Sequence, residues 1–421
     1  MNVSKIVVMG LGYVGLPTAA VFASRRIQVL GVDVNQQAVD TINRGEIHIV
    51  EPSLDIVVRA AVTEGYLKAA TQPEPADAFL IAVPTPFKDD KVPDLAYVES
   101  SARAIAPVLA AGNLVVLEST SPVGTSEQLS AWLAEERPDL TFPHQAGDAS
   151  DIRIAHCPER VLPGQVIREL VENDRVIGGI TPTCATEALK LYKKVVQGDC
   201  ITTTARTAEM AKLTENSFRD INIAFANELS LICDRLDINV WEMIRLANRH
   251  PRVNILSPGP GVGGHCIAVD PWFIVDSAPE QARLIRLARE VNDHKPDWVL
   301  QKVTGMMEAL HRDLPGRTRQ DIKVACLGVA FKPDIDDLRE SPALKITRAI
   351  AELGCQVLVV EPNVRTLPDH LSRPNLRKAS LVEALEEADI VCILVRHKPF
   401  TEARNEIKRI PQLIDTVGLV N

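Results

Sequence analysis

A thiol in a glycine-rich loop is the side chain of this sequence best suited to covalent chemistry. Cys266 comes directly after the segment Gly261–His265 and four residues before the carboxylate of Asp270. Glycine lets a backbone approach a ligand closely and adopt a positive φ, and a thiolate held in such a loop is a nucleophile. The other seven cysteines lie outside any comparable loop, several of them in apolar runs typical of buried side chains (positions 157, 184, 200, 233, 326, 355 and 392). We therefore expect Cys266 to be the nucleophile.

The neighbours of this thiol allow more than one interpretation. His265 adjoins Cys266, but neighbouring side chains in an extended loop point apart, so we do not expect His265 to be the catalytic base. Asp270 either accepts a proton or polarises a water, or it simply ends the loop. The sequence contains no Cys-x-x-Cys pair and no Cys/His cluster with the spacing of zinc ligands. We expect no metal, and a reducing compartment.

A helix-like stretch carries a second group of polar side chains. Lys212 and Asn216 are four residues apart and Arg219 follows three further on, so all three share one face of a helix. Such a trio is usually a solvated surface. The apolar residues around it, among them Leu213 and Phe218, indicate instead an enclosed helix, where a partly buried lysine can stabilise an oxyanion or move protons. The spacing leaves both interpretations open.

The N-terminal segment has the pattern of a dinucleotide-binding turn. Gly10, Gly12 and Gly15 follow the predicted strand Ile6–Met9 and open a predicted helix. These glycines allow a tight turn and a close approach of pyrophosphate, to which the helix N-terminus offers N–H groups. Asp33 ends the next predicted strand, where a carboxylate accepts hydrogen bonds from ribose hydroxyls and repels a 2′-phosphate. The pattern predicts NAD rather than NADP, and a purely structural glycine turn is the alternative.

Two threonines follow further predicted strands. Thr85 lies in the segment Val83–Pro86 and Thr120 in the segment Glu118–Gly124. Ligands of an open α/β sheet bind outside the carboxyl ends of its strands, so both threonines could contact cofactor or substrate. By itself, the pattern favours an ordinary hydroxyl-rich turn between strand and helix.

The order of the apolar runs predicts an α/β protein. Two Rossmann-like, doubly wound domains (1–205 and 318–421) should be joined by a central helical dimerisation segment (206–312), because short apolar runs alternate with amphipathic stretches on either side of it. The predicted strands are Ile6–Met9, Gln28–Val32, Ala78–Val83, Leu114–Leu117, Ile152–His156, Ile322–Gly328, Gln356–Val360 and Ile390–Val395, and the central helical stretches are Thr207–Asn248 and Gln281–Leu310. Helices between two α/β halves often form subunit contacts, so we expect a homodimer.

Charge and hydropathy exclude several classes of protein. The 421 residues carry a net charge of −9, which argues against general binding to nucleic acid or to a membrane surface. No apolar stretch approaches the ~20 residues that a membrane-spanning helix needs, and the N-terminus lacks the pattern of a signal peptide. We expect a cytoplasmic protein.

From end to end, the chain resembles the nucleotide-sugar 6-dehydrogenases. The motifs that carry the resemblance, in family order, are Gly10–Gly15, Glu118–Gly124, Cys157–Arg160, Lys212–Asn216, Gly261–Asp270 and Phe331–Arg339. The segments Asn43–Pro52, Cys157–Gly164 and Arg249–Asn254 resemble the branch of the family that acts on UDP-N-acetyl-D-mannosamine. Enzymes of the family that act on UDP-glucose usually have Ser before the catalytic Cys and Lys before the following Asp. This chain has His265 and Val269 there, which favours an N-acetylhexosamine.

The resemblance implies a role for each motif residue. The implied catalytic residues are Cys266 as nucleophile, Lys212 in proton transfer and oxyanion stabilisation, Asn216 and Asp270 in positioning the reacting groups, Glu159 as the base for hydrolysis and Thr120 in holding a water. The residues implied to hold NAD are Gly10, Gly12, Tyr13, Val14, Gly15, Asp33, Thr85 and Thr120. Those implied to line the substrate, some of them from a neighbouring subunit, are Arg160, Val161, Lys212, Asn216, Arg219, His250, Arg252, Gly263, Lys332 and Arg339.

The implied reaction joins a hydride acceptor to a thiol. Oxidation of the C6 alcohol of a UDP-sugar to an acid removes four electrons, so two NAD are reduced, and a thiohemiacetal and then a thioester on Cys266 connect the two oxidations. UDP-N-acetylglucosamine or UDP-glucose are alternative substrates. A two-electron hydroxyacid dehydrogenase would give Cys266 no role. A catalytically silent NAD- or UDP-sugar-binding regulator is the alternative from outside the enzymes.

Overall fold

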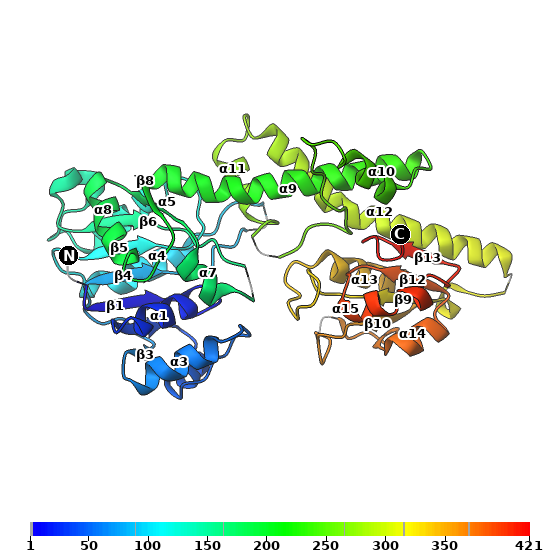
Figure 1. Ribbon diagram of the computed structural model, residues 1–421, viewed down its shortest axis with the longest axis horizontal. Helices are drawn as coiled ribbons and strands as arrows, with labels where there is room; N and C mark the ends of the chain where they lie inside the picture. The colour runs from blue at the N-terminus through cyan, green and yellow to red at the C-terminus, as the bar shows by residue number, and fades with distance from the viewer. Residues whose placement is uncertain (1–2, 89, 163, 265, 315, 369–370) are drawn as a thin grey trace. The chain divides into compact units, whose positions relative to one another are not determined.

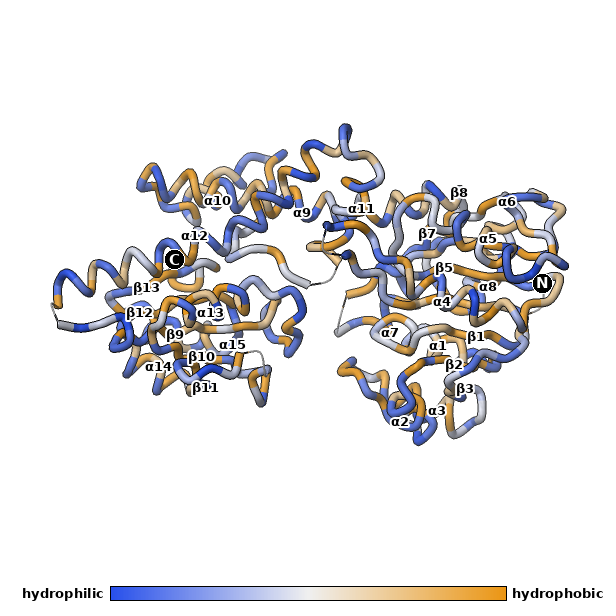
Figure 2. The backbone as a smooth tube through the Cα atoms, turned by 180° about the vertical axis from the view of Figure 1, so that it is seen from behind, coloured by the Kyte–Doolittle hydropathy of each residue, from blue (hydrophilic) through white to orange (hydrophobic). Residues whose placement is uncertain are grey.

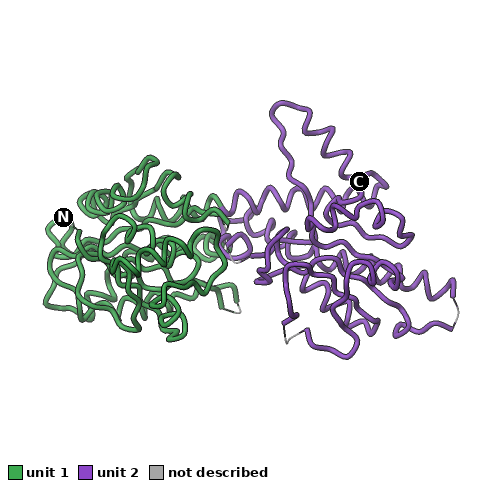
Figure 3. Tube along the Cα trace, turned by 60° about the horizontal axis from the view of Figure 1, so that its bottom comes forward, with its two compact units in different colours: residues 1–215, 272–278 green, residues 216–271, 279–421 purple. Residues whose placement is uncertain are grey.

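The computed structural model describes residues 3–421 except 89, 163, 265, 315 and 369–370. The chain divides into two compact units, which Figure 3 colours separately. The first contains residues 1–215 and 272–278, and the second contains residues 216–271 and 279–421. Each unit is built around a β-sheet of its own (Figure 1). The prediction of an α/β protein with two doubly wound sheets is confirmed.

An eight-stranded sheet forms the centre of the first unit. Its strands are β1 (Lys5–Met9), β2 (Gln28–Val32), β3 (Leu67–Ala70), β4 (Ala78–Ile81), β5 (Leu114–Leu117), β6 (Arg153–His156), β7 (Arg175–Gly179) and β8 (Cys200–Thr204). They lie in the order β3-β2-β1-β4-β5-β6-β7-β8. The strand pairs are parallel except for β6 and β7, which pair antiparallel. The sheet therefore departs at this pair from the all-parallel order typical of a doubly wound domain. β3, β7 and β8 were not among the predicted strands.

Helices cover both faces of this sheet. They are α1 (Gly15–Ser24), α2 (Gln36–Asn43), α3 (Leu54–Thr63), α4 (Ala96–Ile105), α5 (Thr125–Glu136), α6 (Pro143–Ala146), α7 (Val166–Glu172) and α8 (Pro182–Tyr192), with short 3-10 helices at Ala106–Val108 and Gly147–Ala149. Alternate side chains of a strand point to opposite faces. Ile6 and Val8 of β1 therefore join the core that contains α1, whereas Val7 and Met9 join the core that contains α4 and α5. Strands buried on both faces are apolar along most of their length, which Figure 2 shows as orange tube.

Four helices follow β8 along the chain. They are α9 (Ala205–Arg235), α10 (Val240–Ala247), α11 (Asp270–Ser277) and α12 (Arg283–Asp313). The prediction of one helical stretch from Thr207 to Asn248 is wrong at its middle. Asp237 adopts a left-handed φ of 56°, which ends α9. Asn239 then caps α10, because its side chain accepts hydrogen bonds from the amides of Trp241 and Glu242.

A five-stranded parallel sheet forms the centre of the second unit. Its strands are β9 (Lys323–Leu327), β10 (Gln356–Val360), β11 (Leu376–Lys378), β12 (Ile390–Ile393) and β13 (Leu413–Asp415), in the order β11-β10-β9-β12-β13. Its helices are α13 (Pro342–Glu352), α14 (Leu381–Glu387), α15 (Lys398–Glu402) and α16 (Arg404–Ile407), with a 3-10 helix at Arg319–Asp321. Helices α12 and α13 share one apolar core with this sheet, and α14, α15 and α16 share the other. Ser341 caps α13 by accepting a hydrogen bond from the amide of Leu344.

Candidate active site

The turn between β1 and α1 has the geometry of a dinucleotide-binding turn. Gly10 adopts a φ of 86°, and a Cβ there would lie 2.6 Å from the carbonyl oxygen of Ala82. A Cβ on Gly15 would lie 1.8 Å from the carbonyl oxygen of Gly10. A Cβ on Gly12 would meet nothing within 4 Å, so the packing of the described residues does not require glycine there. Open space beside the turn fits the close approach of a pyrophosphate.

Asp33 lies at the end of β2 beside this turn. Its Oδ2 accepts the amide of Leu11 at 2.9 Å and its Oδ1 accepts the amide of Asn35 at 2.9 Å. The carboxylate is thus oriented by backbone donors on both sides, and its half-buried position leaves lone pairs for ribose hydroxyls. Tyr13, with 38% of its surface exposed, and Val14, which precedes α1, complete the turn. These residues fit NAD.

Thr85 and Thr120, which follow β4 and β5, come together as the sheet order requires. The Thr85 hydroxyl donates to the carbonyl oxygen of Thr120 at 2.6 Å. Ser119 ties the same two loops, because its hydroxyl accepts the amide of Val83 at 2.9 Å and donates to the carbonyl of Val83 at 2.7 Å. Both threonines remain half-buried at the carboxyl edge of the sheet, where cofactor and substrate bind in open α/β sheets.

Glu159 lies in a buried ion pair that the sequence did not reveal. Its Oε2 accepts from the Nη1 of Arg175 at 2.7 Å, its Oε1 accepts the amide of Arg160 at 2.7 Å, and only 7% of its side chain is exposed. The Arg160 guanidinium holds the carboxylate of Glu215 at 2.7 Å, and Val161 packs against the first core. Each oxygen keeps a second lone-pair site, so the carboxylate can still accept a proton from water.

The first turns of α9 hold Lys212 over the carboxyl edge of the first sheet. Glu209, one turn earlier, is 1% exposed and accepts from the amides of Gly124 and Ser126 at 2.7 and 2.8 Å. It thereby joins α9 to the N-terminus of α5, where a carboxylate is stabilised by free amides. Lys212 makes no ion pair with any residue that the structure describes. Its charge acts on the buried His156, whose pKa is lowered to about 3, first by burial.

A second buried carboxyl group, that of Glu118, directly follows β5. Burial raises the pKa of Glu118 to about 7, although the Tyr192 hydroxyl donates to its Oε1 at 2.6 Å. Glu118 begins the segment Glu118–Gly124, but its contact with Tyr192 is not a local pattern, because 74 residues separate the two. Sequence reasoning did not single out Glu209, Arg175 or Tyr192 for the same reason, since their partners are distant in the chain or belong to no recognised pattern.

In the second unit, Cys266, Asp270 and Asn216 come together. The carbonyl oxygen of Cys266 accepts the amides of Val269 and Asp270 at 3.1 and 2.8 Å, which places the thiol one turn before α11. The Asn216 amide group donates to the Oδ2 of Asp270, and the two side chains are 6% and 3% exposed. The carboxylate is therefore fixed by α9 within this unit. His265 lies outside the described residues.

Exposure distinguishes Cys266 from the other cysteines. Cys266 is exposed and Cys200 is half-buried, whereas the remaining six are buried. Burial raises the pKa of Cys157 and of Cys326 to about 12 and that of Cys355 to about 11, so these thiols stay protonated. This agrees with the choice of Cys266 as nucleophile.

The glycines before Cys266 have a structural reason that the sequence did not reveal. Gly261 and Gly264 adopt φ values of 141° and 78°, as the expectation of positive φ required. A Cβ on Gly263 would lie 2.8 Å from the Glu340 carbonyl oxygen and 2.8 Å from the Phe331 Cβ. The amide of Gly264 donates to the Arg339 carbonyl at 3.2 Å. The close approach is thus to the loop between β9 and α13, which carries Lys332 and Arg339.

Most of the cations expected to line the substrate belong to the same unit, whereas Arg160 and Lys212 belong to the first. Arg219, His250, Arg252, Lys332 and Arg339 are all exposed. The Arg339 guanidinium is held by the carboxylate of Asp337 at 2.6 Å, whereas Lys332 makes no ion pair with any described residue. Exposed cations in one loop provide charge for a diphosphate despite the acidic composition of the chain.

Metal and membrane chemistry find no support in the described part of the chain. No group of three or more His, Cys, Asp or Glu side chains there could hold a metal ion. Of the helices searched, none combines the length and the apolar character that crossing a bilayer requires.

Comparison with known proteins agrees with this geometry. Residues 4–196 match the model of the NAD binding domain of the UDP-glucose/GDP-mannose dehydrogenase family, residues 206–294 match its central domain, and residues 325–421 match its UDP binding domain. The UDP-N-acetyl-D-mannosamine dehydrogenase of Campylobacter jejuni is 65% identical over 406 residues, which are 96% of this chain and 98% of that protein. The NDP-N-acetyl-D-galactosaminuronic acid dehydrogenase of Ralstonia nicotianae is 63% identical over 416 residues, 98% of this chain and 96% of that protein.

A solved structure resembles the whole chain. The UDP-D-ManNAc dehydrogenase of Pyrococcus horikoshii superposes with a TM-score of 0.87 at 37% identity, over 99% of this chain and 96% of that one. The match is therefore to the complete architecture and to its sequence at once. With its NAD-binding turn and its exposed thiol loop, the chain belongs to the UDP-glucose/GDP-mannose dehydrogenase family.

Proposed function

We propose that the chain oxidises C6 of UDP-N-acetyl-D-mannosamine to the carboxylate, with two NAD reduced for each sugar. The observation that carries the proposal is the exposed Cys266 beside the buried Asn216–Asp270 pair, in a chain whose other end has the dinucleotide-binding turn. The 65% identity to a UDP-N-acetyl-D-mannosamine dehydrogenase supports this sugar. Such a reaction takes place where NAD is supplied, and we place it in the cytoplasm.

The chemistry assigns each electron pair. Bound NAD supplies the acceptor for one hydride in each of two oxidations. After the first oxidation, the Cys266 thiolate adds to the aldehyde carbon and forms a thiohemiacetal, which again carries a hydrogen on that carbon. The second oxidation turns it into a thioester, and water releases the acid and the thiol. Lys212 would stabilise the oxyanions of these steps. Glu159 is our candidate base for the water, Thr120 holds that water, and Asp270 with Asn216 positions the reacting groups.

The substrate fits the second unit through its UDP group. Residues 325–421 match a UDP binding domain, and we assign Lys332 and Arg339 to the diphosphate. Arg160, Val161, Arg219, His250, Arg252 and Gly263 complete our proposed substrate lining. A sugar of galacto configuration is the second candidate, because a relative named for an N-acetyl-D-galactosaminuronic acid is 63% identical.

A panel of UDP-sugars tests the proposed substrate. We expect purified protein with NAD to form two NADH per molecule of UDP-N-acetyl-D-mannosamine, and mass spectrometry to find the uronic acid. UDP-N-acetylgalactosamine, UDP-N-acetylglucosamine and UDP-glucose should react with lower kcat/KM. One NADH per sugar would contradict the four-electron reaction. Binding of NAD and UDP-sugar without any NADH would identify a regulator instead.

We also propose that a second copy of the chain covers one face of α9. Phe218, Phe225 and Ile232 recur at intervals of seven residues on this helix and are 67%, 50% and 47% exposed. The face on which Asp220 and Asn227 lie is instead buried within the same unit. A helix with one face buried and an apolar stripe exposed on another is typical of a helix that packs in an interface.

Phe225→Glu should convert the dimer to a monomer. A charge in the middle of the apolar stripe must be desolvated when two copies meet, whereas it is solvated in the monomer. Light scattering during gel filtration measures the change in mass. Val382→Glu is the matched control, because Val382 is 67% exposed in α14, away from the stripe. A wild-type monomer, or a Phe225→Glu dimer, would remove the proposal.

A further inference from the structure

The second sheet repeats the turn that binds a dinucleotide in the first. Gly10 and Gly328 each follow the first strand of their sheet with φ values of 86° and 88°. Their amides donate to the carbonyls of Val32 and Val360, the last residues of β2 and β10, both at 2.8 Å. The strand orders around the two turns, β3-β2-β1-β4-β5 and β11-β10-β9-β12-β13, correspond one to one. Glu361 thus stands where Asp33 stands in the first unit.

The two acids make the same backbone hydrogen bonds. Asp33 accepts the amides of Leu11 and Asn35 on its two oxygens. Glu361 accepts the amides of Val329 and Asn363 on its two oxygens, at 2.8 and 3.0 Å. In the first unit the exposed side of the acid is available to a ribose. In the second unit Glu361 is 1% exposed.

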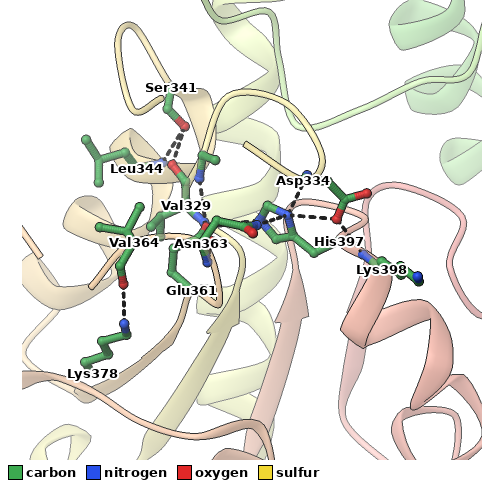
Figure 4. A network of polar contacts seen from close by, with 11 residues as sticks. Val329, Asp334, Ser341, Leu344, Glu361, Asn363, Val364, Lys378, His397 and Lys398 are labelled. Atoms are coloured by element: carbon green, nitrogen blue, oxygen red, sulfur yellow. Dashed lines mark hydrogen bonds and ion pairs between the residues drawn. The ribbon is translucent and has the colours of Figure 1, made fainter. Parts of the chain in front are cut away.

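An imidazole occupies that side of Glu361. His397 follows the last residue of β12 by four residues, as Thr85 follows the last residue of β4. Its side chain is fully buried, and its Nε2 lies 3.0 Å from the Oε2 of Glu361 (Figure 4). The second unit therefore fills with its own side chain the place that a ribose would take beside the corresponding acid.

The other ring nitrogen fixes the proton on His397. Its Nδ1 accepts the backbone amide of Asp334 at 2.9 Å. A backbone N–H can only donate, so Nδ1 carries no proton, and Nε2 must donate to Glu361. Burial alone would raise the pKa of Glu361, but the hydrogen bonds from His397, Val329 and Asn363 lower it below its usual value. The pair is thus a neutral imidazole against a carboxylate.

Both partners hold the loop between β9 and α13. Glu361 accepts the amides of Val329 and Ala330 at its start. His397 accepts the amide of Asp334, whose left-handed φ of 60° is unusual for a residue other than glycine. The Asp334 carboxylate in turn accepts the amide of Lys398 at 2.8 Å (Figure 4). Between and beside these anchors lie Lys332 and Arg339, which themselves make no hydrogen bond to the pair.

We propose that His397 is a positioning residue for the UDP diphosphate: by accepting the Asp334 amide while paired with Glu361, it sets the loop from which Lys332 and Arg339 reach the phosphates. This rests on the assignment of UDP to the second unit. In this proposal Glu361 stabilises the loop between β9 and α13 and does not bind a ribose, although its position in the second sheet corresponds to that of Asp33 in the first.

Three substitutions separate the contact of His397 Nε2 with Glu361 from those of Nδ1, which accepts the Asp334 amide and lies 3.0 Å from the Nδ2 of Asn363. In His397→Asn, the side-chain oxygen takes the place of Nδ1 and can accept the Asp334 amide, while Glu361 keeps its three backbone donors. In His397→Gln, the side-chain amide takes the place of Nε2 and the acceptor for Asp334 is lost. His397→Phe removes the contacts of both ring nitrogens and keeps a ring against Phe400, whose ring centre lies 5.5 Å away.

Titration calorimetry with UDP on the full chain measures the effect. We expect His397→Gln and His397→Phe to bind UDP about three- to tenfold more weakly, the factor that corresponds to one hydrogen bond of ordinary strength. His397→Asn should recover affinity to within about twofold of the wild type. NAD affinity should stay unchanged in all three, and KM for the UDP-sugar should rise while kcat at saturation changes little.

A core variant of the same unit separates positioning from mere loss of stability. Val391→Ala removes apolar contacts of a fully buried strand residue outside the network, so it should lower the unfolding midpoint and leave UDP affinity unchanged. The proposal fails if His397→Gln and His397→Phe bind UDP like the wild type, or if His397→Asn is as weak as His397→Phe. If the wild type binds UDP but forms no NADH, the proposed function fails and the titrations still decide the role of His397. If the wild type does not bind UDP, both fail.

Discussion

Cys266→Ser should lower the rate of uronate formation on the order of 10³-fold or more, with the binding of NAD and UDP-sugar unchanged. A serine hydroxyl stays protonated where a thiol can ionise, and it is a poor nucleophile without an adjacent base. The first oxidation needs no thiol, so the variant should still form aldehyde slowly. Single-turnover experiments with a carbonyl trap would then find one NADH and one trapped aldehyde per sugar.

Cys200→Ser is the matched control for this experiment. Cys200 is half-buried at the start of β8 and belongs to no part of the proposed site. Its replacement should leave turnover unchanged, which excludes a general effect of removing an accessible sulfur. Uronate formation by Cys266→Ser within about tenfold of the wild-type rate would remove the thioester from the mechanism.

The apolar runs of the sequence predicted the buried strands of both sheets more accurately than the exposed ones. The strands Gln28–Val32, Leu114–Leu117 and Gln356–Val360 have the predicted bounds. Apart from the exposed Gln28 and Gln356 at their starts, both of their faces are buried and their sequences are apolar. By contrast, β8 (Cys200–Thr204) has exposed and half-buried residues only, so it lacks the apolar run that marked the other strands, although four of its residues are β-branched. This segment is a strand because it pairs with β7, and nothing in the sequence of the segment itself indicates that partner.

The candidate site divides in the same way. The turn glycines and Asp33 could be predicted, since a positive φ and the end of a strand are local properties. The bonds of Glu209 to the start of α5 and of His397 to Glu361 could not, because 83 and 36 residues separate the partners. Asn239 was a signal that could have been used: an asparagine before an amphipathic stretch is a common helix N-cap, and it would have divided the central helices correctly.

The glycines before Cys266 have a packing role in addition to the role predicted from the sequence. We predicted that they let the backbone approach a ligand. The structure places the loop from Gly261 to Gly264 against Phe331 and Pro342, so closely that a Cβ on Gly263 would lie 2.8 Å from each. The nucleophile's loop and the loop that we assign to the diphosphate are therefore packed as one body within the second unit.

The second large effect that we predict is on stability. Arg289 of α12 is 1% exposed and its Nη1 donates to the Oδ1 of Asp220 in α9 at 2.7 Å. Arg289→Met would leave a fully buried carboxylate with Asn292 as its main donor. Breaking one partner of a buried ion pair costs about 3–5 kcal/mol. We expect a lower urea midpoint for the second unit and faster hydrogen exchange in α9 and α12.

A double variant and the pH dependence test the cause of this loss. Asp220→Leu with Arg289→Met removes both charges, and Asn292 can still donate to the backbone carbonyl of residue 220, so most of the stability should return.

Burial already raises the pKa of Asp220 while Arg289 opposes it. Without the arginine this pKa rises further, so the folded single variant binds a proton that the unfolded chain releases above its ordinary pKa. Relative to wild type, its stability should therefore be greatest at or below the ordinary pKa of aspartate, about 4, and fall as the pH rises above it. A loss that is independent of pH, or that the second substitution does not relieve, would mean that Arg289 acts through packing rather than charge.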